Sequence, residues 1–403
     1  MRNRHFLWVG FCLLLALIPV VNMVSILATT GVDTISNDYL MFIQQADRFL
    51  NGLNEWPEYF RDTLYTGVHS YAFLFPLRML LLRISNMSVY AEITAGMFLA
   101  LARLGLLYHL LTCFLPDQRK PWYRSAYLWL LPCLSALIFA NAQISTFSYG
   151  ETILQFGLTQ SLILVGLVLL LHYPQRWFSA WGAALCGILA SFSGGSGLMA
   201  WPLFLLVLLW TNRRSLLHYA AWVIGLALAC GPYLAYSSFN SPTKFQIPQL
   251  DRLLVSLGLP FANNINFGLQ SHPQAFIIGC LGSLLALVSL ALLAWRKRFV
   301  FQRAAVPALL LMSWGLMLAI QILLSRAMIA PWYTTSYSLF WIGLLGLLPL
   351  LTGPRWPFSL KQTASINPYW LPAWGLSVLV ALVVLYGQSN LTYVDKSFYL
   401  SSR

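Results

Sequence analysis

The chain is a series of long apolar runs separated by short polar connections. A helix needs roughly 20 apolar residues to cross the hydrocarbon core of a bilayer, and most of these runs reach or approach that length. The pattern therefore predicts eleven membrane-spanning helices. Their expected positions are 6–28, 91–115, 125–141, 152–172, 179–194, 197–211, 216–236, 273–294, 304–325, 336–352 and 370–388.

One further apolar run, 71–84, is too short to cross a bilayer comfortably. It holds about 14 residues and contains Pro76, Arg78 and Arg83. A run of this length is typical of a helix that lies in the membrane interface, or that enters the bilayer and leaves on the same side. We therefore expect 71–84 to lie along the membrane rather than across it.

The distribution of basic residues supports this expectation, because cytoplasmic loops of membrane proteins carry an excess of lysine and arginine. If 71–84 does not cross, six short cytoplasmic segments hold 14 of the 24 basic residues, whereas a crossing would move twelve of the fourteen outside. Eleven spans, a cytoplasmic N-terminus and an external C-terminus are therefore favoured. The fourteen residues are Arg2, Arg4, Arg119, Lys120, Arg124, Arg176, Arg213, Arg214, Arg296, Lys297, Arg298, Arg303, Arg355 and Lys361.

Composition agrees with this class of protein. Of 403 residues, 59% are apolar and only 9% are charged, and the mean hydropathy is +0.70. Soluble domains carry roughly 25% charged residues, so a water-soluble enzyme, a disordered chain and a coiled coil are excluded. The net charge of +13 would suggest nucleic acid in a soluble protein, but topology explains it here. We expect one all-α transmembrane domain over 1–403, with a long outer loop at 29–90 and a short outer tail at 389–403.

Acidic residues are distributed differently. Six of the eleven lie between residues 33 and 62 in the first outer loop, and topology does not explain this because acidic residues contribute little to orientation. Apolar residues recur there at helical intervals, which predicts a helix over 38–51 lying along the membrane, ended by Gly52. The six acids are Asp33, Asp38, Asp47, Glu55, Glu58 and Asp62.

Asp38 is the first candidate for chemistry in this loop. It falls in the first turn of the expected helix, where a carboxylate interacts favourably with the helix dipole by about 0.3–1 kcal/mol. The same position keeps the carboxylate ionised at neutral pH, as a general base at the membrane surface requires. A structural role and a catalytic role are both open at this point. Asp33, five residues earlier, is the second candidate base.

Charge inside the expected spans is almost absent. Arg103 lies in the middle of its span, where a charged side chain is costly and is expected to face the protein interior or water. Glu92 lies about three helical turns away, too far to pair with Arg103 directly. The segment Ser193-Gly194-Gly195-Ser196-Gly197 must join two short spans, 179–194 and 197–211, and is expected to form a tight turn.

Several segments, taken in their order along the chain, resemble the GT-C superfamily of polytopic glycosyltransferases. The similarity is closest to bacterial members without a C-terminal soluble domain, and no segment is a specific motif alone. The segments are Ser36-Asn37-Asp38-Tyr39 with the helix that follows, His69 to Arg78 (HSYAFLFPLR), Glu151 to Phe156 (ETILQF), Phe192 to Pro202 (FSGGSGLMAWP) and Trp332 to Trp341 (WYTTSYSLFW).

The resemblance implies an enzyme that moves a sugar from a polyprenyl-phosphate donor to a glycan, lipid or protein acceptor on the periplasmic side of a bacterial inner membrane. Asp38 is then the expected base, with Asp33 in reserve. Arginine matches phosphate oxygens with its planar fork. Arg326, just beyond the span 304–325, is therefore the first candidate for the donor phosphate, and Arg78 is the second.

The resemblance further implies that Glu151, His69 and Tyr333 contribute to substrate binding. No cofactor is expected beyond the lipid-linked sugar, and without a clear DxD motif no divalent ion is invoked. Membrane lipids are expected partners and nucleic acid is not. The main alternative is a secondary transporter or flippase for a lipid-linked or small solute, which the scarcity of midplane charge disfavours. A polysaccharide polymerase or ligase and a structural membrane subunit are further alternatives.

Overall fold

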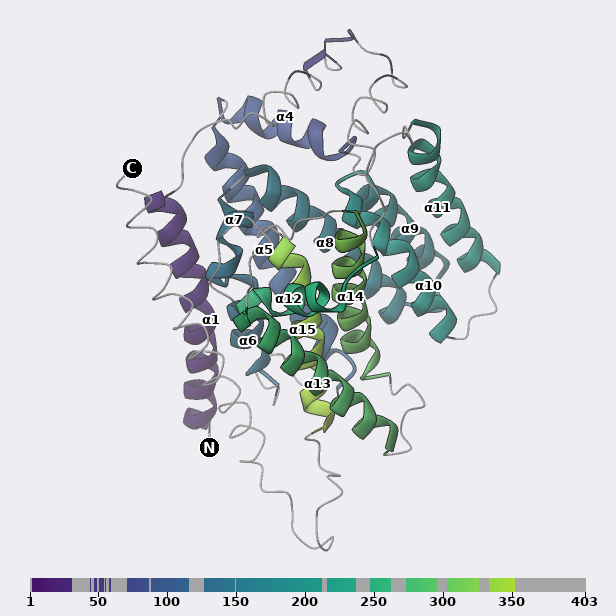
Figure 1. Ribbon diagram of the computed structural model, residues 1–403. Coiled ribbons are helices and arrows are strands. Elements are labelled where there is room, and N and C mark those ends of the chain that lie inside the picture. Colours follow the sequence, from purple (N-terminus) through teal and green to yellow (C-terminus); the bar gives the residue numbers. More distant parts are fainter. Residues whose placement is uncertain are drawn as a thin grey trace, which may run out of the picture. The chain divides into compact units, whose positions relative to one another are not determined.

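Every regular element in the described part of the chain is a helix (Figure 1). The structure is a computed structural model, and it describes residues 2–30, 44, 47–48, 51–53, 55, 58, 71–86, 88–115, 127–148, 150–211, 216–236, 247–261, 273–295, 303–325 and 333–351. The last predicted span, 370–388, lies outside these residues.

Within the described residues, seven helices are long and apolar enough to cross a membrane. Each matches a predicted span to within four residues at either end, so the chain is an all-α polytopic membrane protein. They are α1 (Arg2–Thr30), α5 (Val89–Thr112), α8 (Gly150–His172), α11 (Leu216–Tyr236), α13 (Pro273–Trp295), α14 (Val306–Ser325) and α15 (Thr334–Leu351).

Three shorter apolar helices occupy the remaining described spans: α6 (Leu130–Ile138), α9 (Trp177–Ser191) and α10 (Ala200–Trp210). The first is shorter than the expected 125–141, because the backbone becomes extended at Ala140 before the short helices η2 (Asn141–Gln143) and α7 (Ile144–Phe147). The buried Gln143 side chain donates to the Leu137 carbonyl. That carbonyl belongs to the last turn of α6, where no helical partner is available.

The chain divides into two compact units, which are described separately. The first consists of Met1–Thr30, Leu107–Thr146 and Phe245–Arg403, and the second of Gly31–Leu106 and Phe147–Lys244.

In the first unit, α1 and α6 run in the same direction. The Ser135 hydroxyl donates to the Ala16 carbonyl at 2.6 Å, and the Asn22 amide donates to the Asn141 amide oxygen at 2.9 Å. Residue numbers therefore rise together along the two helices. Within the apolar span α1, Asn22 finds an amide partner of the kind that polar side chains in membranes need.

A helix not foreseen from the sequence, α12 (Leu250–Gly258), also belongs to the first unit. Its backbone meets the backbone of α13 at two glycines, because a Cβ on Gly258 or on Gly279 would overlap a carbonyl group of the other helix. The Leu257 carbonyl accepts from Nε1 of Trp341 in α15 at 2.6 Å. Glycine and this indole bond therefore hold α12 against two spans.

In the second unit, α5 and α8 run in the same direction. A Cβ on Gly96 would meet Ile153, Gly157 faces Leu99, and further along Arg103 bonds to Gln160. Parallel helices require the chain between them to return to its starting side. The segment between α5 and α8 therefore carries the chain back.

The helices α9 and α11 are parallel as well, since a Cβ on Gly225 would meet Ala184 and the Tyr233 hydroxyl bonds to the Ser191 carbonyl. The intervening α10 therefore returns the chain. It follows the end of α9 after a turn and the short helix η3 (Gly195–Met199), so the predicted tight pair of short helices is confirmed.

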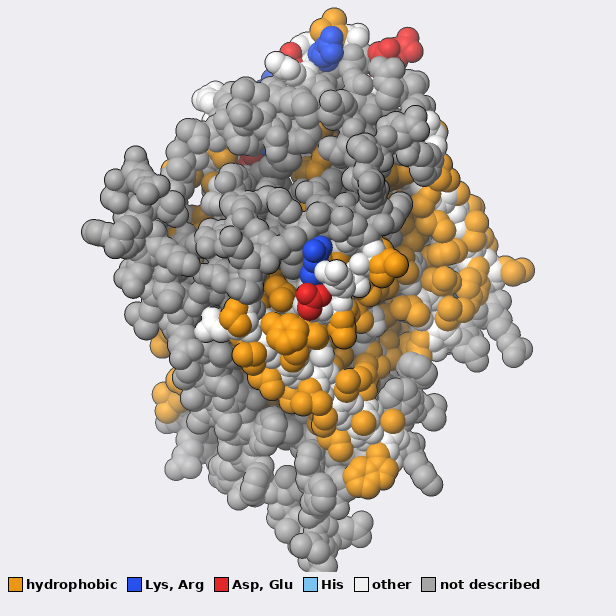
Figure 2. All heavy atoms as spheres, viewed as in Figure 1, with side chains coloured by type: hydrophobic (Ala, Val, Ile, Leu, Met, Phe, Trp, Pro, Cys, Tyr) orange, Lys and Arg blue, Asp and Glu red, His pale blue; other side chains and the backbone are white. Residues whose placement is uncertain are grey.

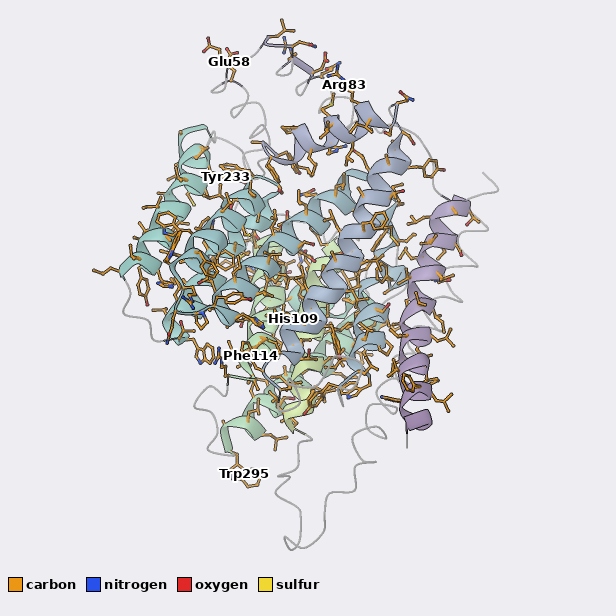
Figure 3. The ribbon with its side chains drawn as sticks, turned by 180° about the vertical axis from the view of Figure 1, so that it is seen from behind. Glu58, Arg83, His109, Phe114, Tyr233 and Trp295 are labelled. Carbon is orange, nitrogen blue, oxygen red and sulfur yellow. The ribbon has the colours of Figure 1, made fainter. Side chains whose placement is uncertain are left out.

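The predicted short helix is α4 (Leu74–Ile84), of 11 residues. At 1.5 Å per residue it is about 16 Å long, roughly half the hydrocarbon thickness of a bilayer. Figures 1 and 3 both show it lying across the end of the second unit where α5 begins. By contrast, α13 presents apolar side chains outward along its length, as a lipid-facing helix does (Figure 2).

Candidate functional site

Most of the predicted site residues lie outside the described residues. These are Asp33, Asp38, His69 and Arg326. Glu151 is the second residue of α8, and its side chain also falls outside the description. Their roles stay predictions. The structure describes helices that precede or follow them in the sequence.

Arg78 lies in the middle of α4, and its side chain is 4% exposed. Its Nε–H donates to Oε1 of Glu92 in α5 at 3.0 Å, and the Glu92 side chain is fully buried. Burying a charge without an opposite charge beside it is costly, so each of the two residues offsets the cost of burying the other. The sequence analysis did not single out Glu92 for this role. A separation of 14 residues follows no helical spacing, and the pair forms only because α4 folds across the start of α5.

Glu92 also lies against the start of α8. A Cβ on Gly150 would be 2.6 Å from Oε2 of Glu92 and 2.8 Å from its Cβ. The first turn of a helix presents backbone N–H groups without helical partners and the positive end of the helix dipole. The Glu92 carboxylate therefore has a favourable electrostatic neighbour on two sides. Gly150 is required because any side chain there would collide with Glu92.

The N-terminal end of α4 is attached to the end of α9. The Phe73 backbone N–H donates to the Phe192 carbonyl at 2.9 Å. Tyr71 and Phe75 stack with ring centroids 5.2 Å apart, and both belong to a buried apolar cluster that includes Leu154 of α8. Contacts to α5, α8 and α9 thus fix α4 in place. Arg83, near its end, is exposed, and Figure 3 labels it together with Glu58 of the preceding loop.

The turn after α9 is packed rather than open. A Cβ on Gly197 would overlap the backbone of Ala190, so only glycine fits there. The Ser191 hydroxyl accepts from Nε1 of Trp201 at 3.0 Å, and the Ser191 carbonyl accepts from the Tyr233 hydroxyl at 2.8 Å. This turn holds the ends of three helices together beside the attachment point of α4.

Tyr333 lies in the first unit, directly before α15, and is buried. The five residues that follow it, 334–338, all carry hydroxyl groups and are all buried. Thr335 donates to the Gln143 amide oxygen at 2.7 Å and lies 3.2 Å from the Thr146 hydroxyl. The predicted segment therefore gathers neutral hydroxyl groups, each of which can donate and accept hydrogen bonds.

Arg103 faces the protein interior, as predicted for a charge in mid-span. It is buried, and its Nη1 donates to Oε1 of Gln160 in α8 at 2.6 Å. Among the described residues, no carboxylate lies within ion-pairing distance of it. The guanidinium therefore meets an uncharged acceptor inside an apolar bundle.

A small part of the first outer loop (29–90) is described. We call it the acid-rich loop because it holds six of the eleven acidic residues. Asp47 and Arg48 are helical, the Asn51 N–H bonds to the Asp47 carbonyl, and the Leu53 N–H bonds to the Arg48 carbonyl. Gly52 has a φ of +68°, the left-handed conformation that ends many helices. The predicted helix end at Gly52 is therefore confirmed.

Within the described ranges, no three His, Cys, Asp or Glu side chains are grouped closely enough to hold a metal ion. Comparison with known protein families, with curated proteins and with solved structures finds no match. What this protein does must therefore be inferred from its own residues and geometry.

Proposed function

We propose that this protein is a glycosyltransferase of the bacterial inner membrane that resembles the GT-C superfamily. It moves a sugar from a polyprenyl-phosphate donor to a glycan, lipid or protein acceptor on the periplasmic side. The observation that carries the proposal is the anchoring of α4 by the buried Arg78–Glu92 pair. The acid-rich loop joins the helical bundle at this fixed helix, which suits chemistry on a lipid-linked substrate because the acids must stay at the membrane surface.

Helix directions support eleven spans with α4 not crossing. Consecutive spans alternate in direction, so a crossing α4 would make α1 and α6 antiparallel. The ordered contacts in the first unit make them parallel, and the parallel α5 and α8 agree with the same count. The proposal combines this direction of the helices with the basic residues of the short loops, which favour a cytoplasmic N-terminus and a periplasmic C-terminus and acid-rich loop.

In this proposal Asp38 removes the acceptor proton as the sugar transfers, with Asp33 as the alternative base. Arg326 binds the donor phosphate, whereas Arg78, the second candidate from the sequence, is buried against Glu92. The remaining binding groups, Glu151, His69 and Tyr333, hydrogen-bond the sugar or the acceptor. No metal ion is invoked, because the sequence carries no clear DxD motif. The general base is expected to contribute about 10²–10⁴-fold in rate.

The deciding experiment replaces Asp38 by asparagine, which keeps the shape and most of the helix capping but removes the base. Transfer from a panel of polyprenyl-phosphate sugars should fall by at least about 10²-fold while the protein remains monodisperse. Glu58→Gln, a loss of charge at an exposed residue of the same loop, is the matched control and should leave transfer unchanged. Collapse in Asp33→Asn alone would move the base upstream. Full turnover in both Asp variants would rule out a carboxylate base in this segment.

The phosphate site is tested separately by two substitutions at one position. Arg326→Ala should weaken donor binding more than Arg326→Lys, because lysine keeps the charge but loses the bidentate fork. Binding of a short-chain polyprenyl phosphate to the purified protein measures this without turnover. Unchanged binding in the alanine variant would remove Arg326 from the site.

Labelling with membrane-impermeant reagents tests the topology. A cysteine placed at Asn54 should react from outside intact cells, and one placed at Gln118 should not. Reaction at Gln118 from outside would overturn the eleven-span arrangement.

A transporter or flippase for a lipid-linked or small solute is the second candidate, and Arg103 is the observation that favours it. A charge buried in mid-span often marks a solute pathway, and here it meets only a neutral amide among the described residues. Arg103→Met should leave sugar transfer intact if the protein is the proposed enzyme. Loss of solute movement in this variant, without any transfer activity in the wild type, would favour the transporter.

A further inference from the structure

The Arg78–Glu92 pair lies where three helices of the second unit meet. Arg78 comes from α4, Glu92 from the first turn of α5, and the Glu92 carboxylate also lies against Gly150 at the start of α8. Glu92 is therefore the residue through which α4 is held to two spans at once.

Access to Arg78 argues against a direct role in binding the donor. Its side chain is 4% exposed, and the Nε face of its guanidinium is occupied by Glu92. A lipid phosphate would reach it only after α4 had left its place on α5 and α8.

Displacement of α4 would also disturb the acid-rich loop, which is joined to α4 through Tyr71 and the two residues that follow it. The helix is pinned at that end by the Phe73–Phe192 backbone bond and by the apolar cluster around Leu154. The ion pair pins it in the middle. Two attachments of different chemistry thus fix the point at which the loop returns to the bundle.

We infer that Glu92 is a positioning residue for the outer-loop site. It holds Arg78, and through Arg78 it holds α4, the helix through which the preceding loop is joined to the bundle. Arg78 then affects the reaction only by forming the ion pair with Glu92 that holds α4, and it does not contact the donor. This inference rests on the proposed function for its catalytic consequence, but the attachment itself is independent of what the protein catalyses.

The experiment uses the full chain in lipid nanodiscs and two readouts, hydrogen exchange of the peptide that covers α4 and the kinetics of sugar transfer. Two single variants, Glu92→Gln and Arg78→Met, each break the ion pair. The double variant Arg78→Met/Glu92→Leu replaces the pair by apolar residues, which removes both buried charges together. Arg83→Met is the matched control, because it removes an arginine from the same helix without touching the pair.

We expect the single variants to speed exchange of α4 by at least about 100-fold, because breaking a buried pair leaves a charge without its partner. In them kcat should fall while the KM for the donor changes little. The double variant should restore slow exchange and most of kcat, and Arg83→Met should match the wild type in both readouts.

Two outcomes overturn the inference. If α4 exchanges slowly in both single variants, Glu92 does not hold the helix. If the double variant restores slow exchange but its KM for the donor is higher than that of the wild type, Arg78 binds the donor directly. A wild-type protein that transfers no sugar at all would overturn the proposed function, and the exchange data would still decide whether Glu92 anchors α4.

Discussion

Two arginines of the second unit are buried to the same extent but have different kinds of hydrogen-bond partner. Arg78 and Arg103 are each 3% exposed. Arg78, on a short helix at the end of the unit, bonds to a carboxylate, whereas Arg103, inside a long span, bonds to an amide. Both contacts join α5 to a neighbouring helix, but only the first compensates the charge.

The difference shows what each site is built to do. A compensated pair tolerates burial and fixes two elements relative to one another, so it suits an anchor. A guanidinium whose partner is uncharged has no opposite charge to offset the cost of its burial in an apolar span. Substitutions at four positions can test the contrast.

The largest effect is expected at the carboxylate. Glu92→Leu leaves Arg78 buried without its partner and should lower the free energy of unfolding by about 3–5 kcal/mol. Denaturation in mild detergent, followed by helix content, measures it. The double variant with Arg78→Met should recover most of this loss. Equal stability of the single and double variants would mean that Arg78 does not depend on Glu92.

The second test changes the partner of Arg103. Gln160→Leu removes the acceptor and should destabilise the protein by about 1.5–3 kcal/mol, the usual value of a hydrogen bond to a charged group. Gln160→Glu supplies a carboxylate, makes the site resemble the Arg78 pair and should stabilise the protein. The same denaturation assay applies. A destabilised Gln160→Glu variant would show that the charge of Arg103 is already compensated.

The third test crowds the anchor. A Cβ at residue 150 would lie 2.6 Å from Glu92 Oε2, so Gly150→Ala should force the carboxylate to shift and cost about 1–3 kcal/mol. Thermal unfolding measures the loss. If Gly150→Ala were neutral, Glu92 would not be packed against the start of α8.

The smallest effect belongs to the control for that substitution. Gly105, in the same span as Glu92, has open space where a Cβ would be placed. Gly105→Ala should therefore stabilise the helix by about 0.5–1 kcal/mol, because alanine loses less backbone freedom than glycine on forming a helix. Opposite signs for the two alanine substitutions in one thermal scan would separate crowding from propensity.

Sequence patterns predicted the long helices well because their signal is local. The run that became α5, the shortness of α4 and the inward orientation of Arg103 all follow from residues close together in the chain. The end of the loop helix at Gly52 was predictable for the same reason, since glycine is the residue that adopts its left-handed conformation without strain.

Long-range contacts were not predictable. The role of Glu92 depends on α4 folding back over α5, and nothing near residue 92 indicates it. Likewise α12 has only 9 residues within a polar connection, and it is held by contacts with α13 and α15. The early end of α6 depends on Gln143, whose side chain points back to the Leu137 carbonyl. In each case the decisive partner is fixed by tertiary structure rather than by spacing.

The glycine contacts between α12 and α13 also set an order of events during synthesis. The chain is made from its N-terminus, so α12 leaves the ribosome before α13. Its docking surface, the backbone around Ala275 and Gly279, does not yet exist at that moment. With 9 residues α12 is too short to be inserted as a span. The two backbones can therefore close on one another only after α13 has been made.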